Sequence, residues 1–135
     1  MTEHTGSCRC GQLRVLAKGD PVRVSICHCL ACQKRTGSVF SAQARWPSEC
    51  VTTEGESKQW TRTADSGQTT VYNFCPDCGS RVFSTNLESF PGAVFATLGC
   101  IDNPAGIEPV LEMFVKRRLK WVAPLPLPQF QDMPH

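Results

Sequence analysis

Short runs rich in apolar and β-branched residues recur along the whole chain, and turn-forming residues separate them. In residues 39–46, apolar and polar side chains alternate at roughly every second position, which is typical of a half-buried strand. Gly, Pro, Asp and Ser gather between the runs, for example at 19–21 and 65–67. Many short strands at this spacing predict an all-β domain. The strands are expected at residues 13–17, 22–26, 39–46, 71–74, 81–84, 94–98, 113–115 and 119–122.

A single short helix is predicted at residues 30–35, because Thr36 and Gly37 follow it directly. The last segment, 124–135, contains four prolines and therefore forms neither a helix nor a central strand. It is either an extended arm on the surface or disordered. No internal repeat is visible, so we expect one domain over residues 1–123, followed by a Pro-rich C-terminal arm over residues 124–135.

Length and charge set further limits. A chain of 135 residues is most simply one domain. The formal charge of +2 counts every cysteine as neutral. Deprotonating seven thiols and binding two zinc ions would change the charge to about −1, so the basicity is a weak indication of nucleic-acid binding. The first ten residues contain no apolar stretch, and no run approaches the ~20 apolar residues that cross a bilayer. We therefore expect a cytoplasmic protein with no membrane partner.

Cysteine changes this picture most, because seven of the nine cysteines fall into three tight clusters. In a reducing compartment such clusters indicate metal binding or catalysis more often than disulfides. The first and third clusters together offer four sulfurs, a closed set typical of structural zinc. The middle cluster offers three and leaves one position open, as catalytic zinc does. The clusters are Cys8 and Cys10, then Cys27, Cys29 and Cys32, then Cys75 and Cys78.

The four-thiolate site is expected to connect distant parts of the chain. Cys8 and Cys10 would point to the same side of an extended strand, because side chains two positions apart share a face. Residues 75–79, Cys-Pro-Asp-Cys-Gly, look like a zinc-ribbon knuckle in which Gly79 tolerates a positive φ. Zinc in this closed site would stabilise the fold. In the alternative interpretation, one cysteine pair binds metal alone or stays free.

The three-thiolate site is expected where a strand leads into the helix. Strand alternation would put the first two thiols of the cluster on one side, and the following turn would bring back the third. His28 would then face the other side as a packed or hydrogen-bonded residue. The alternative is a fourth ligand supplied by His28, Cys50 or Cys100. An open fourth position would bind and deprotonate a thiol, and three thiolates favour such a soft ligand, so we expect chemistry on sulfur.

Three motifs follow one another in a set order along the chain. They are C-x-C-G, then C-H-C-x-x-C with Thr-Gly-Ser at 36–38, then F-C-P-x-C-G. In this order they resemble the glutathione-dependent formaldehyde-activating enzyme family, also called the Gfa-like or centromere-protein-V-like family. The resemblance covers about residues 6–122 and includes 98–102 and Trp121. One departure is Glu112 and the three residues after it, where family members often carry a histidine.

The resemblance implies a zinc-bearing all-β fold of short antiparallel strands, similar to the Mss4-like fold. It implies a carbon–sulfur lyase that combines glutathione and formaldehyde into S-hydroxymethylglutathione, so a small thiol and an aldehyde are the expected partners. We expect Arg35 to pair with one glutathione carboxylate, and backbone N–H groups near Gly37 and Ser38 to bind the other. The resemblance also implies structural zinc at Cys8, Cys10, Cys75 and Cys78 and catalytic zinc at Cys27, Cys29 and Cys32.

Two other functions compete with this interpretation. A non-catalytic zinc module would bind a protein or a nucleic acid, and basic residues at 116–120 beside Trp121 would contact phosphate and base. Four cations in five residues are, however, more typical of a solvated strand edge. A thiol-based redox sensor would release its three-thiolate zinc on oxidation.

Overall fold

The computed structural model describes residues 2–134 and confirms the all-β prediction. Within these residues, ten strands are joined by one α-helix and three short 3-10 helices, and no helix has the length and apolar character needed to cross a membrane. In chain order the elements are β1 (Glu3–Ser7), β2 (Arg14–Lys18), β3 (Arg23–Cys27), α1 (Leu30–Thr36), β4 (Ser41–Pro47), η1 (Ser48–Cys50), β5 (Val51–Glu54), β6 (Lys58–Thr63), β7 (Thr69–Phe74), β8 (Arg81–Asn86), β9 (Phe90–Thr97), η2 (Leu98–Cys100), β10 (Leu111–Met113) and η3 (Val115–Arg117).

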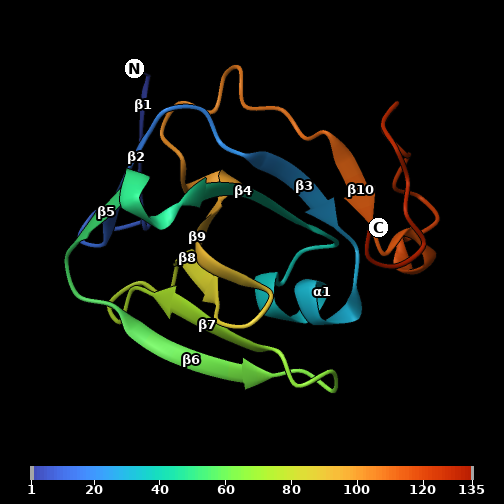
Figure 1. Cartoon of the computed structure of the whole chain (residues 1–135), viewed down its shortest axis with the longest axis horizontal. Helices are drawn as coiled ribbons and strands as arrows, with labels where there is room; N and C mark the ends of the chain where they lie inside the picture. The colour runs from blue at the N-terminus through green and yellow to red at the C-terminus, as the bar shows by residue number, and fades with distance from the viewer. Residues whose placement is uncertain (1, 135) are drawn as a thin grey trace.

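The strands form two sheets, as Figure 1 shows. The smaller sheet has the order β1-β2-β5, and the larger sheet has the order β10-β3-β4-β9-β8-β7-β6. All neighbouring strands pair antiparallel except β10, which pairs parallel with β3. The smaller sheet and the C-terminal segment lie on opposite sides of the molecule (Figure 1). The parallel pairing brings the end of β10 beside the end of β3, where α1 begins.

Trp46 is a central residue of the core. Its side chain is 0% exposed, and its Nε1 donates a hydrogen bond of 2.9 Å to the carbonyl oxygen of Gly19. Ala44, two positions earlier in β4, is buried with it, as the alternation in this segment predicted. A second apolar cluster contains side chains of β2 and β8 together with Cys8 and Cys75. Two of the clustered cysteines, Cys8 and Cys75, are therefore built into the core.

The prediction missed three strands, β1, β5 and β6, and all three are edges of their sheets. The side chains of β5 and β6 are almost all exposed, so these strands lack the apolar alternation that marks a buried face. The strand predicted at residues 119–122 is wrong, because the backbone turns there and Val122 N–H donates to the oxygen of Leu119 at 3.0 Å. The strand predicted at 113–115 lies two residues earlier, since Val115 already begins η3.

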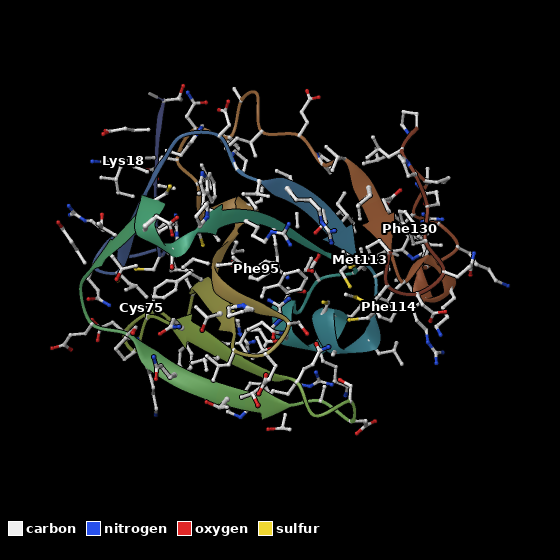
Figure 2. The ribbon with its side chains drawn as sticks, in the orientation of Figure 1. Lys18, Cys75, Phe95, Met113, Phe114 and Phe130 are labelled. Atoms are coloured by element: carbon white, nitrogen blue, oxygen red, sulfur yellow. The ribbon has the colours of Figure 1, made fainter. Side chains whose placement is uncertain are left out.

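The C-terminal arm lies against β10, so residues 124–134 follow the extended-arm alternative. Its backbone continues the sheet at one point, where Glu112 N–H donates to Pro128 and Phe130 N–H donates to Glu112, at 3.0 and 2.9 Å. Figure 2 shows Phe130, Phe114 and Met113 gathered on this side of the molecule. All three belong to the apolar cluster around Cys27. The arm is therefore part of the packing around the middle cysteine cluster.

Candidate metal centres

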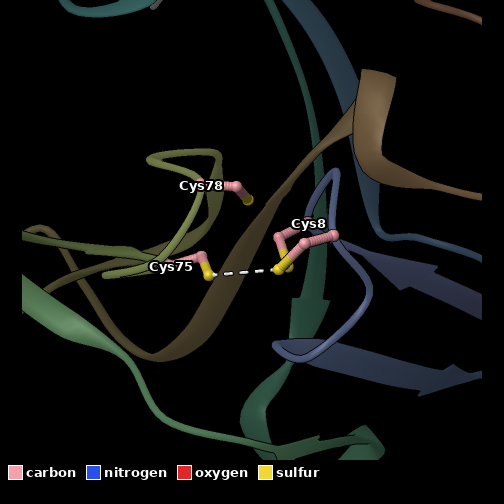
Figure 3. A group of neighbouring side chains, drawn as sticks. Cys8, Cys75 and Cys78 are labelled. Atoms are coloured by element: carbon pink, nitrogen blue, oxygen red, sulfur yellow. Dashed lines mark hydrogen bonds between the residues drawn. The ribbon is translucent and has the colours of Figure 1, made fainter.

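Cys8, Cys10, Cys75 and Cys78 form the first sulfur cluster, in which all four Sγ atoms lie within 4.8 Å of one another. The Sγ of Cys10 lies 3.6 Å from that of Cys8 and 3.7 Å from that of Cys75. In tetrahedral zinc–thiolate sites the Zn–S distance is about 2.3 Å, which sets the S–S distance at about 3.8 Å. The cluster, seen in Figure 3, therefore fits a four-thiolate zinc site.

Two tight turns present these four sulfurs. In the first turn Gly11 N–H donates to the oxygen of Cys8 at 3.1 Å, and in the second Gly79 N–H donates to the oxygen of Cys75 at 2.8 Å. Both glycines have positive φ, +87° and +78°, a conformation that glycine adopts without steric cost. The extended geometry predicted for Cys8 and Cys10 is wrong, because β1 ends before Cys8 and the chain turns at once.

N–H donors surround the sulfurs of the first cluster. The Sγ of Cys8 accepts a hydrogen bond from Leu13 N–H at 3.3 Å. The Sγ of Cys75 accepts one from Gln12 Nε2 at 3.0 Å and one from Asp77 N–H at 3.4 Å. Such donors stabilise thiolate charge and hold the sulfurs in orientation.

The thiols of this cluster do not ionise alike. A hydrogen bond from the Ser80 hydroxyl lowers the pKa of Cys78 to about 5. A backbone N–H of Gln12 favours the Cys10 thiolate, but the surrounding sulfurs, that of Cys8 first, raise the pKa of Cys10 to about 12. Without a cation, repulsion between neighbouring thiolates would therefore keep some of these thiols protonated. A divalent cation offsets that repulsion and allows all four to ionise, so the electrostatics of the cluster fit a bound metal ion.

Cys27, Cys29 and Cys32 form the second cluster, and their Sγ atoms also lie within 4.8 Å of one another. Cys27 ends β3, and Cys29 is the N-cap of α1, where its sulfur accepts the N–H of Cys32 at 3.3 Å. The first turn of the helix thus returns the third sulfur to the first two, as predicted. Three sulfurs supply three corners of a tetrahedron. Cys29 and Cys32 are only partly buried, so the cluster can be reached from solvent.

Cys32 is the preferred position for negative charge in the second cluster. The neighbouring thiols of Cys27 and Cys29, and more weakly the charge of Arg35, lower the pKa of Cys32 to about 2. Contact with Cys29 and then with Cys32 raises the pKa of Cys27. Arg35 Nη2 lies 3.5 Å from the Sγ of Cys32. Three thiolates could share this site only with a divalent cation, and the sulfur donor set fits zinc.

The remaining candidate ligands lie elsewhere. His28 is fully buried and its Nε2 lies 2.8 Å from Oε1 of Glu112, so it is hydrogen-bonded, as the sequence favoured. Cys50 packs against the apolar core, and the Sγ of Cys100 lies 3.2 Å from the oxygen of Arg81. Among residues 2–134, neither of these two cysteines belongs to a cluster with the geometry of metal ligands.

A pocket of about 490 Å³ is lined by α1 and by strands β6, β7 and β8, close to the second cluster. Four of its eight lining side chains are cationic, and none is acidic. The pocket is therefore suited to an anionic ligand. Its lining residues are Leu30, Ala31, Lys34, Arg35, Trp60, Arg62, Tyr72 and Arg81.

Tyr72 holds two of these arginines on its ring. The guanidinium carbons of Arg35 and Arg81 lie 4.9 and 5.3 Å from the ring centroid, and Trp60 stacks on the same tyrosine with centroids 5.8 Å apart. Arg35 Nε and Arg81 Nη1 are buried and have no hydrogen-bond partner in the chain. Burial, and then the charge of Arg35, lower the pKa of Arg81. Two neighbouring guanidinium groups, each with a free donor, have the charge and the planar donor geometry that suit a carboxylate.

Comparison with known proteins adds a family to this geometry. The family model described as "Glutathione-dependent formaldehyde-activating enzyme" matches residues 3–117, which include all seven clustered cysteines. The chain belongs to this family. Membership supports an enzyme with a glutathione-related, formaldehyde-activating function.

A solved structure agrees with the fold. The crystal structure of a Rhodobacter sphaeroides protein, a structural genomics target, superposes with a TM-score of 0.61. The two chains are 17% identical, and the match covers 81% of this chain and 99% of the other. At this identity the likeness concerns the fold alone. No curated protein matches the chain.

In the loop after the second cluster, the backbone N–H groups that we expected to bind a glutathione carboxylate already have partners within the chain. Gly37 N–H donates to the oxygen of Gln33 at 2.9 Å, and Ser38 N–H donates to Oγ1 of Thr36 at 3.1 Å. These N–H groups are thus engaged in the C-terminal cap of α1, and neither residue lines the pocket. Arg35, by contrast, does line the pocket.

The basic stretch 116–120 forms η3 and a turn, so the predicted strand edge is wrong. Within it, Lys116 forms an ion pair with Asp132, and Arg118 forms one with Glu112 at 3.3 Å. Two of its four cations are therefore already paired with carboxylates of the chain.

Proposed function

We propose that this protein is a zinc-dependent carbon–sulfur lyase that forms or breaks an adduct between glutathione and formaldehyde or a related aldehyde. One zinc ion, at the four-cysteine cluster, would stabilise the fold. A second, at Cys27, Cys29 and Cys32, would serve the reaction. A zinc ion held by three thiolates accepts a soft fourth ligand and lowers the pKa of a thiol bound there. The two sulfur donor sets support this division.

One observation carries the proposal: two guanidinium groups, each with one unpaired buried N–H donor, lie in a cationic pocket next to Cys32. Glutathione has two carboxylates and a net negative charge at neutral pH. Arg35 and Arg81 would bind one carboxylate, and Lys34 or Arg62 would bind the other. Each charge-assisted hydrogen bond of this kind contributes about 1.5–3 kcal/mol. The pocket therefore offers both the charge and the location needed to hold the glutathione thiol beside the three cysteines.

In this mechanism the side chains of the protein bind and orient the substrates. The glutathione sulfur attacks the aldehyde carbon, and a C–S bond forms while the π electrons of the C=O bond move to oxygen. The oxygen takes a proton from water, and the thiol proton is lost to water. The reverse reaction breaks the C–S bond and releases the aldehyde. The residues that line the pocket include neither a carboxylate nor an imidazole, so we assign no side chain as a general base.

The test is the exchange rate between glutathione plus formaldehyde and their adduct, measured by NMR at equilibrium with zinc-loaded protein. We expect the wild type to accelerate exchange, and Cys32→Ser to lose the acceleration. Cys50→Ser is the matched control, because Cys50 lies outside both clusters and should keep it. If protein with two bound zinc ions gave no acceleration, formaldehyde would be excluded as the aldehyde.

A further inference from the structure

Glu112 is a buried carboxylate to which the proposed reaction gives no role. Its side chain is 2% exposed, yet it accepts hydrogen bonds from four groups. Oε1 accepts from His28 Nε2 at 2.8 Å. Oε2 accepts from Gln129 Nε2 at 2.7 Å, from Leu125 N–H at 2.9 Å and from Arg118 Nη2 at 3.3 Å. A buried carboxylate costs free energy to desolvate, and an apolar group of equal size is often as stable, so the burial of Glu112 points to a specific role.

One side of this carboxylate faces the second cysteine cluster. His28 stands between Cys27 and Cys29 in the chain, so contacts that fix its backbone also fix the peptide units that join these two cysteines. Its N–H donates to the oxygen of Met113 at 3.1 Å, and its own oxygen accepts from Gln33 Nε2 at 2.9 Å. The imidazole, the N–H and the carbonyl of His28 are therefore each held by a different partner.

The other side of the carboxylate faces the C-terminal arm. Two of the three donors to Oε2, Leu125 N–H and Gln129 Nε2, come from the arm, and Gln129 also forms an isolated parallel bridge with Glu112. One residue further on, Phe130 packs with Phe114 against the apolar cluster that contains Cys27. The arm therefore meets the segment of the cysteines through the carboxylate of Glu112 and through the side chain of Phe130.

Phe114 adds backbone strain at this position. Among the described residues other than glycine, it is the one with a positive φ, at 53°. A left-handed conformation is sterically unfavourable at such a residue and persists only where the surrounding contacts enforce it. Phe114 N–H donates to the oxygen of Asp132 at 3.1 Å, so one of these contacts comes from the arm. The arm therefore also fixes the backbone beside the second cluster.

We propose that Glu112 is a positioning residue for the second metal centre, and that it locks the C-terminal arm to His28 so that Cys27 and Cys29 keep the spacing of metal ligands. The inference depends on the proposed function for the metal at Cys27, Cys29 and Cys32. Loss of the lock would leave the first cluster unchanged, because that cluster shares none of these contacts. Groups that hold metal ligands in place from outside change metal affinity by about 10- to 100-fold when they are removed.

The test is the rate at which each zinc ion passes to a chromogenic chelator in a stopped-flow experiment. Two variants break the lock from its two ends, Glu112→Gln and Gln129→Ala. Their matched controls are Glu108→Gln and Gln131→Ala, whose side chains are exposed. We expect zinc release from the second cluster to be about tenfold faster in both test variants. Release from the first cluster should match the wild type.

The visible spectrum of bound Co²⁺ provides a second readout. If Glu112 only stabilised the fold, its replacement would leave this spectrum unchanged. Thiolate-bound Co²⁺ absorbs in the visible range with a band pattern that depends on ligand geometry, so the spectrum of the second cluster should change in Glu112→Gln and stay constant in Glu108→Gln. Unchanged release rates and spectra would refute the positioning role, and so would equal acceleration at both clusters. If Glu112→Gln failed to fold, Gln129→Ala would decide. A wild type that binds one metal ion would instead refute the proposed function.

Discussion

Gln12 donates a hydrogen bond of 3.0 Å from Nε2 to the sulfur of Cys75, 63 positions further along the chain. The same nitrogen donates to the oxygen of Glu56 at 2.7 Å, and Oε1 of Gln12 accepts the N–H of Glu56 at 3.0 Å. One amide side chain therefore joins the first turn of the four-cysteine cluster, the segment between β5 and β6, and the sulfur of the second turn.

Replacing Gln12 by alanine should destabilise the zinc-loaded protein. The change removes three hydrogen bonds, one of them to a thiolate, and we expect the free energy of unfolding to fall by about 2–3 kcal/mol. Denaturant unfolding followed by circular dichroism measures it. Gln131→Ala is the control, since Gln131 is exposed in the arm. A loss below about 0.5 kcal/mol, within the range of ordinary surface substitutions, would contradict a connecting role for Gln12.

Gly55 should tolerate alanine far less well than Gly67. Both have a positive φ, +97° and +89°, so both variants carry similar backbone strain, about 1 kcal/mol. A Cβ at Gly55 would lie 2.0 Å from the oxygen of Gln12, whereas a Cβ at Gly67 would meet nothing within 4 Å. We expect Gly55→Ala to cost about 2–3 kcal/mol more in unfolding free energy than Gly67→Ala. Equal melting temperatures would show that the segment at Gly55 moves freely.

The two cysteine clusters should respond differently to loss of a sulfur. Cys8 is buried in the core, so we expect Cys8→Ser to lower the unfolding free energy by about 3 kcal/mol or more, with loss of one zinc ion. Cys32 is only partly buried, so Cys32→Ser should also lose one zinc ion but keep the fold. Zinc content by atomic emission and thermal unfolding provide the two readouts. Similar destabilisation in both variants would contradict the division into structural and catalytic sites.

Arg81 should contribute strongly to glutathione binding. Arg81→Met keeps much of the side-chain length over Tyr72 but removes the charge, so we expect the affinity for glutathione to fall about tenfold or more. Titration calorimetry with zinc-loaded protein measures this change. Lys18→Met is the control, because Lys18 lies on β2, away from the pocket (Figure 2). A similar affinity in both variants would mean that glutathione binds outside the pocket.

Features coded within a few residues could be predicted from the sequence. The cysteine spacings predicted both clusters, because the turn at Gly79 and the N-cap at Cys29 are local structures. Strand β4 could be predicted because Ala44 and Trp46 share a buried face. The turn at Cys8 was missed, since two thiols two positions apart are equally compatible with a strand.

Features that depend on distant pairing could not be predicted. The contact between His28 and Glu112 joins residues 84 positions apart, and neither segment marks it. The pocket draws Arg35 from a helix and Tyr72 and Arg81 from two strands, so no single stretch of sequence carries its charge. Strand β6 has exposed side chains and forms because β7 offers it backbone hydrogen bonds. A local signal existed only in Trp60 and Arg62, which share a face of that strand.

The division of the four-cysteine cluster between two turns has a consequence for how the chain folds. Cys10 and Cys75 are 65 positions apart, so a zinc ion bound at both turns closes a large loop. Closing a loop of this size costs about 4 kcal/mol of chain entropy at 25 °C. Each turn can form early from its own residues, but the complete binding site exists only after most of the two sheets has assembled. Refolding should therefore have a late step that depends on zinc concentration, and chelation should accelerate unfolding more than it slows the initial collapse.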